Sequence, residues 1–168
     1  MSPTADLHVL AQIAITLAGF TGIIGVFQQR SGNILTDRER LHIVNLLQAT
    51  AVIVFLAFVP SCLTLLPIVG LDIWAWSIRI LFAVHILAWI IGSISLTRFL
   101  SIINSLPKTE RAIIFGLLLP AGIATTVVEG LVVAGHWTNY TTFIYEVALI
   151  FFLGIAFVAF ISLLLKPE

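Results

Sequence analysis

Long apolar runs separated by short polar links make up nearly all of this 168-residue chain. A helix needs roughly 20 apolar residues to cross the roughly 30 Å of hydrocarbon in a membrane. Five runs meet that requirement, at residues 7–27, 41–66, 73–96, 112–134 and 142–165. The pattern therefore predicts an all-α integral membrane protein, a bundle of five transmembrane helices that forms one transmembrane domain over residues 1–168.

Local signals predict where these helices begin and bend. Thr36 and Glu39 have the spacing of a capping box, which predicts that the second helix starts ahead of its apolar run. Pro60 and Pro67 are expected to bend or end that helix. Pro120 lacks a backbone donor, so we expect the fourth helix to bend there.

Composition narrows the class of function. Hydrophobic residues make up 60% of the chain and charged residues only 10%, against about 25% charged in ordinary soluble domains. The net charge is zero and no basic face is evident, so nucleic acid is not expected as a partner. No phosphate-binding glycine loop follows a strand, and no nucleophile stands beside a base. We therefore expect no enzymatic activity and no bound cofactor.

The basic residues predict the orientation of the chain, because positive charges gather in cytoplasmic links. The first link, the third link and the C-terminal tail hold seven of them: Arg30, Arg38, Arg40, Arg98, Lys108, Arg111 and Lys166. We expect the N-terminus outside, the C-terminus in the cytoplasm and the protein in the inner (plasma) membrane. No basic residue precedes the first apolar run, so that run is expected to persist as a helix and not to be a signal peptide.

Small residues recur along one side of the first predicted helix. The candidates for close helix packing are Ala14, Ala18, Gly22 and Gly25. Lipid tails are as apolar as leucine, so the hydrophobic effect does not drive helices together within a membrane. Small side chains instead let helix backbones approach closely and gain van der Waals contact. We therefore expect a homo-oligomer, or a subunit of a larger membrane complex.

Three charged residues inside the apolar runs form the main candidate site. Counted from the predicted outer helix ends, Arg79, Glu129 and Glu146 lie at one level, ~9 to 10 Å deep at 1.5 Å per residue. Charges at this depth tend to pair, so Arg79 is expected to neutralise one of the carboxylates. The second carboxylate is then a candidate proton or cation site. His85 lies six residues deeper on the third helix and points about 120° away from Arg79.

Further polar residues fall towards the two ends of the predicted bundle. The candidates at the outer mouth are Asp6, His8, Gln12, Asp72 and His136. The candidates for an inner lining are His42, Asn45 and Gln48. Apolar residues between the two groups are expected to act as a hydrophobic gate or as a sealed core.

These features favour an ion or proton channel or transporter that uses Arg79, Glu129, Glu146 and His85. One alternative is a non-catalytic structural or accessory subunit, in which the same charges only fasten helices together. A second alternative is a metal- or haem-binding membrane protein, because histidine and carboxylate are suitable metal ligands. No pair of them has a tight ligand spacing, however, so no metal site is predicted.

Overall fold

The computed structural model describes residues 3–30, 36–68, 70, 72–94 and 107–164. All the regular elements in these ranges are helical. Within them, five helices are long and apolar enough to cross a membrane: Ala5–Val26, Asp37–Thr64, Ile73–Ile91, Lys108–Val133 and Thr138–Leu164. The prediction of five apolar helices is therefore confirmed. The predicted helix ends at residues 95–96 and 165 lie outside the described ranges.

The chain divides into two compact units, one built from residues 1–57 and 149–168 and the other from residues 58–148. Helix α2 (Asp37–Thr64) and helix α7 (Thr141–Leu164) each contribute to both units. The expectation of a single domain stays a prediction.

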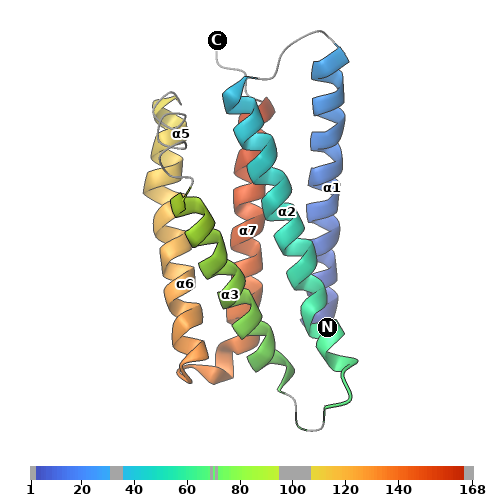
Figure 1. Cartoon of the computed structure of the whole chain (residues 1–168), viewed down its shortest axis with the longest axis vertical. Helices are drawn as coiled ribbons and strands as arrows, with labels where there is room; N and C mark the ends of the chain where they lie inside the picture. The colour runs from blue at the N-terminus through green and yellow to red at the C-terminus, as the bar shows by residue number, and fades with distance from the viewer. Residues whose placement is uncertain (1–2, 31–35, 69, 71, 95–106, 165–168) are drawn as a thin grey trace. The chain divides into compact units, whose positions relative to one another are not determined.

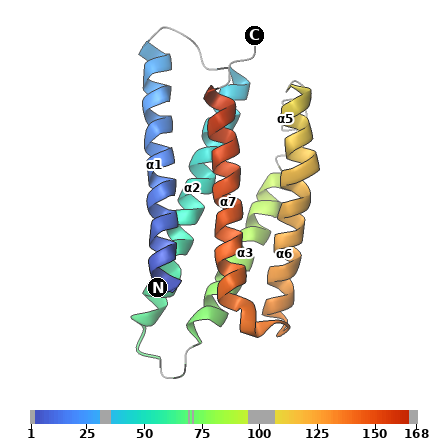
Figure 2. The same cartoon turned by 180° about the vertical axis from the view of Figure 1, so that it is seen from behind.

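The first unit contains helix α1 (Pro3–Arg30), the first part of α2 and the last part of α7, which lie beside one another (Figure 1, Figure 2). Leu46 and Ala49 of α2 pack against Ala156 and Ala159 of α7, with Leu17 of α1 at the edge of the cluster. The alanines allow α2 and α7 to approach closely. Arg38 adds a bond between them, because its Nη2 donates to the Ser162 carbonyl at 3.2 Å.

The second unit contains the candidate site. Helix α3 (Ile73–Ile94) and helix α6 (Leu119–Val133) run antiparallel and side by side, as both views show (Figure 1, Figure 2). A short 3-10 helix, η2 (Thr138–Tyr140), leads from α6 into α7. At the start of α3, the Trp74 ring meets the buried Tyr145 ring of α7 edge-on, with centroids 6.0 Å apart.

The capping box predicted for α2 is confirmed. The Thr36 hydroxyl accepts a hydrogen bond from the Glu39 amide at 3.2 Å, and the Glu39 carboxylate accepts one from the Thr36 amide at 2.9 Å. Pro60 lies inside α2, which continues past it to Thr64. The helix thus begins where the sequence predicts and is not ended by its first proline.

The helical hydrogen bonding changes just before Pro120, where the sequence predicts a bend. Helix α5 (Lys108–Ile113) passes into a π-helical turn, η1 (Ile114–Leu118), and then into α6. The Leu119 amide donates to the Ile114 carbonyl, five residues back, in place of the usual four. The widened turn directly precedes Pro120, whose ring would otherwise clash with the Gly116 carbonyl.

The capping box yields a first prediction. Thr36→Ala removes the hydroxyl that accepts from the Glu39 amide, and should lower the free energy of unfolding by about 1 kcal/mol. Thr36→Ser keeps the hydroxyl and should stay close to the wild type. Denaturant unfolding in detergent micelles measures both; equal losses in the two variants would show that the cap does not stabilise α2.

Candidate functional site

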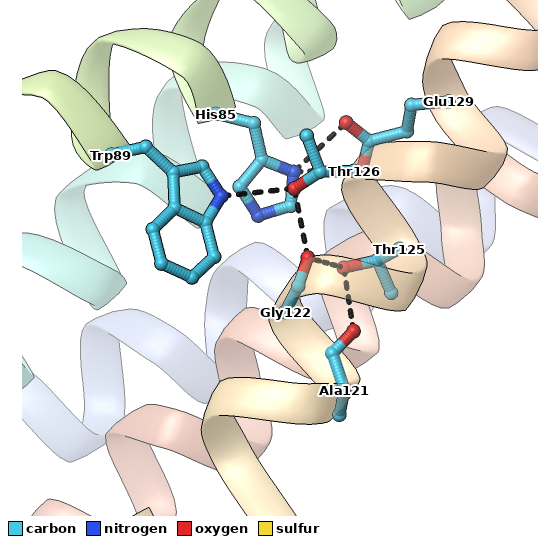
Figure 3. Close-up of polar contacts among 7 residues, drawn as sticks. All are labelled: His85, Trp89, Ala121, Gly122, Thr125, Thr126 and Glu129. Carbon is cyan, nitrogen blue, oxygen red and sulfur yellow. Dashed lines mark hydrogen bonds and ion pairs between the residues drawn. The ribbon is translucent and has the colours of Figure 1, made fainter. Parts of the chain in front are cut away.

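Glu129 is the most deeply buried charged residue among the described residues of the second unit. Its side chain is 0% exposed, and its carboxylate faces His85, which is 4% exposed. The His85 Nδ1 atom lies 2.8 Å from both Glu129 Oε1 and Glu129 Oε2, and the direction of the hydrogen bond depends on which residue carries the proton (Figure 3). A charge-assisted hydrogen bond of this length is about twice as strong as a neutral one.

Helical spacing brings these two residues face to face. On α6, Gly122, Thr126 and Glu129 recur at intervals of four and three residues, which places them on the side of the helix that meets α3. On α3, His85 and Trp89 follow at an interval of four. The facing side of each helix therefore carries its polar groups in two successive layers.

A close approach between the helices supports the pair. A Cβ atom built on Gly130 would lie 3.3 Å from Cε2 of Phe82, tighter than almost all real contacts. Phe82 precedes His85 by one turn and Gly130 adjoins Glu129, so glycine allows α6 to approach α3 beside the pair.

The second polar layer lies one turn away along α6. Trp89 Nε1 donates to Thr126 Oγ1 at 3.0 Å, and the Thr126 hydroxyl donates to the Gly122 carbonyl at 2.8 Å (Figure 3). The Thr125 hydroxyl bonds to the Ala121 and Gly122 carbonyls, both at 3.0 Å. Polar side chains within this apolar hairpin are thus satisfied locally.

The pair can hold one proton in two places. With the proton on Nδ1, imidazolium faces carboxylate; with the proton transferred, neutral imidazole accepts from a carboxylic acid. The transfer breaks the N–H bond at His85 and forms an O–H bond at Glu129 without moving any heavy atom far. Both side chains are buried, so each faces the other and little solvent.

Arg79 is located away from this pair. Its side chain is exposed, and its guanidinium carbon lies 5.1 Å from the centroid of the Trp76 ring, in a cation–π contact. The sequence predicts that Arg79 neutralises one of the two carboxylates, Glu129 or Glu146. Of these, Glu129 is bonded to His85. His85 follows Arg79 by six positions, which turns the two residues to different sides of α3, so only one of them can face Glu129.

Side-chain direction explains why Arg79 does not contact Glu129, although residue counts place the two at the same depth. Each Cα–Cβ bond tilts towards the N-terminus of its own helix. Because α3 and α6 run in opposite directions, His85 and Glu129 lean towards each other and Arg79 leans away. Helix polarity, read from the sequence together with the predicted spans, is the signal that would have identified His85 as the partner.

The remaining charged candidates are dispersed. Glu146 is half-buried on α7, and its carboxylate is not among the contacts of Glu129. Asp72 caps α3, where its Oδ1 accepts from the Ala75 amide at 3.0 Å, and His136 is exposed in the turn after α6. In the first unit, Asp6 and Gln12 of α1 are exposed and His8 is half-buried.

The candidates for an inner lining do not share one environment. On α2, His42 is buried, Asn45 is half-buried and Gln48 is exposed. Among the proposed packing residues of α1, Ala14 is buried, Ala18 and Gly25 are half-buried and Gly22 is exposed. The roles assigned to both groups stay predictions.

Metal binding needs several convergent ligands. Among the described residues, no three His, Cys, Asp or Glu side chains come together in a way that could hold a metal ion. His85 and Glu129 are a suitable pair of donor types, yet Glu146, His8 and His136 do not complete a set with them.

Unfolding measurements on a double-mutant cycle test the pairing. Glu129→Leu should lower stability by about 3 to 5 kcal/mol, because it leaves a buried histidine without its carboxylate. Combined with His85→Leu, the losses should be non-additive by about 0.5 to 3 kcal/mol. The matched control combines Glu129→Leu with Arg79→Gln and should be additive within about 0.5 kcal/mol. Stronger coupling to Arg79 than to His85 would contradict the assigned contact.

The approach of α3 and α6 gives a second testable consequence. Gly130→Ala gains helix propensity but drives a methyl group against Phe82, whereas Gly154→Ala on α7 meets nothing within 4 Å of the added atom. We expect Gly130→Ala to be less stable than Gly154→Ala by about 1 kcal/mol or more. Adding Phe82→Leu should recover part of that difference. Equal stabilities for the two alanine variants would exclude a tight contact at Gly130.

Comparisons with protein-family models, curated proteins and solved structures return no match to this chain. Functional inference therefore depends on the chemistry of the His85–Glu129 pair and the helices that hold it.

Proposed function

We propose that this protein moves protons across a membrane, as a channel or a transporter, and that His85 and Glu129 are its proton-holding site. One observation carries the proposal: a fully buried glutamate lies 2.8 Å from a buried histidine, between helices long and apolar enough to span a membrane. Ionisable groups at such positions are costly, and they commonly mark ion pathways and proton relays.

The chemistry of the two residues favours a proton over a metal cation. Imidazole and carboxyl groups both accept and release protons, and here the two face each other at 2.8 Å. Transfer between Nδ1 and a carboxylate oxygen converts an ion pair into a neutral pair, so the net charge in the apolar interior does not change. A relay would also need a group that delivers a proton to one residue of the pair and a group that accepts a proton from the other.

The same bond also fits the alternative of a structural or accessory subunit. In that case the pair only fastens α3 to α6, and its loss should affect stability without any change in flux per folded molecule. The two alternatives therefore differ in whether a folded variant lacking the carboxylate still conducts.

We further propose the topology and assembly that the sequence favours, with the N-terminus outside, the C-terminus cytoplasmic and the protein in the inner membrane. Arg38 and Arg40 at the start of α2, and Lys108 and Arg111 in α5, support this orientation. Arg98 and Lys166 lie outside the described residues.

Open space along α1 supports association with another helix, in a homo-oligomer or a larger complex. A Cβ atom built on Gly19, Gly22 or Gly25 meets nothing within 4 Å. These glycines would allow close approach of a helix backbone from a second chain, as small residues do in other membrane helices.

Proton flux into liposomes tests the function. Purified protein is reconstituted with a pH-sensitive dye inside, and a pH gradient is imposed with the membrane potential clamped. The wild type should acidify the lumen, and Glu129→Gln should reduce the rate by about tenfold or more, because the amide cannot take part in the same proton exchange. His85→Gln should have a similar effect.

Glu39→Gln is the matched control, since it also converts a glutamate to glutamine while glutamine can preserve the capping box. Its flux should equal that of the wild type. If folded Glu129→Gln protein conducts at the wild-type rate, or if the wild type conducts no protons at any gradient, the proposed function is wrong and the structural role remains.

A further inference from the structure

A cavity of about 280 Å³ lies in the second unit, where α3 begins and α6 ends. Its polar lining comprises Asp72, Arg79, Thr138, Asn139, Thr141 and Thr142, and Trp74 forms part of its wall. The site is therefore a mixed pocket with one cationic and one anionic side chain, several neutral hydrogen-bonding groups and an aromatic surface.

Arg79 has no carboxylate partner among the described residues. Its contact is with the Trp76 ring, which covers a face of the guanidinium and leaves the N–H groups at its edge available. An arginine held in this way is preorganised for a planar, two-point contact with carboxylate or phosphate oxygens. Because Glu129 is bonded to His85, it does not occupy the guanidinium of Arg79.

Asp72 adds the opposite charge at a defined separation. Asp72 lies just before α3 and precedes Arg79 by seven positions, which places both on nearly the same side of the helix, ~10.5 Å apart along its axis. One carboxylate oxygen of Asp72 accepts from the Ala75 amide. The pocket thus presents a cationic group and an anionic group to one ligand.

We infer that this cavity binds a phosphate group at Arg79, and that the ligand is the headgroup of a phosphatidylethanolamine, with its ammonium group directed to Asp72. The location supports a lipid source, because the pocket lies at helix ends that carry Trp74, Trp76 and Tyr140. Tryptophan and tyrosine are enriched at the level of lipid headgroups. The hydroxyl and amide groups of Thr138, Asn139 and Thr142 supply further hydrogen bonds to phosphate oxygens.

Lipid titrations followed by native mass spectrometry test the site on the full chain in mild detergent. The probes are phosphatidylethanolamine, phosphatidylglycerol and inorganic phosphate. The wild type should prefer phosphatidylethanolamine, and Arg79→Gln should weaken binding of both lipids by about tenfold. Arg79→Lys keeps the charge and should lose less. Arg40→Gln, an exposed arginine that does not line the cavity, should bind as the wild type does.

Asp72→Asn separates the two halves of the proposal. Asparagine can still cap α3, but it no longer attracts an ammonium group. The variant should therefore lose the preference for phosphatidylethanolamine over phosphatidylglycerol while it keeps the phosphate contact. An unchanged preference would overturn the role of Asp72.

Two further outcomes would show that the proposed ligand is wrong. If inorganic phosphate binds in an Arg79-dependent manner and neither lipid competes with it, the site takes free phosphate and the lipid assignment is wrong. If folded Arg79→Gln protein binds all three probes with wild-type affinity, the cavity is not a phosphate site. Neither result depends on proton flux.

Discussion

A carboxylate enclosed by apolar helices must have a partner within hydrogen-bonding distance, and the arrangement of α3 against α6 follows from this requirement. Glu129 meets it with His85, at 2.8 Å for each carboxylate oxygen. The bond fixes the register of the two helices, since a slide of one turn would separate the pair by ~5.4 Å. The contacts at Phe82 and Gly130, and at Trp89 and Thr126, match the same register.

The elements themselves could largely be predicted from the sequence. Apolar length identifies all five long helices, and the capping box at Thr36 and Glu39 has the predicted partners. These features are local, because a few neighbouring residues determine them. The form of the distortion before Pro120 could not be predicted in the same way. A proline signals that the helical bonding is interrupted, but packing decides whether the chain kinks or widens into a π-helical turn.

The site was harder to predict, because it depends on contacts between helices. Counting residues from the helix ends places Cα atoms at estimated depths and takes no account of side-chain length or direction. Arg79 and Glu129 are level by that count, yet their side chains lean to opposite ends of the antiparallel pair. The long arginine side chain also reaches towards the helix end, where Trp76 covers it. The charged groups of Arg79 and Glu129 are thus apart, although their Cα atoms are expected at the same depth.

The π-helical turn at Ile114–Leu118 has a consequence for changes in chain length. It holds one residue more than an α-helical turn would. The positions that share a face in α5 and in α6 are therefore shifted by one residue from the spacing of a continuous α-helix. Removing one residue there would let the turn close to α-helical geometry and would leave α5 and α6 facing much as they do now, because the widened turn absorbs the extra residue. A deletion between Leu119 and Glu129 has no such surplus, and it would turn Glu129 by about 100° away from His85. The chain is therefore more tolerant of a one-residue deletion at Ile114–Leu118, whose side chains are all at least partly exposed, than in the part of α6 that follows.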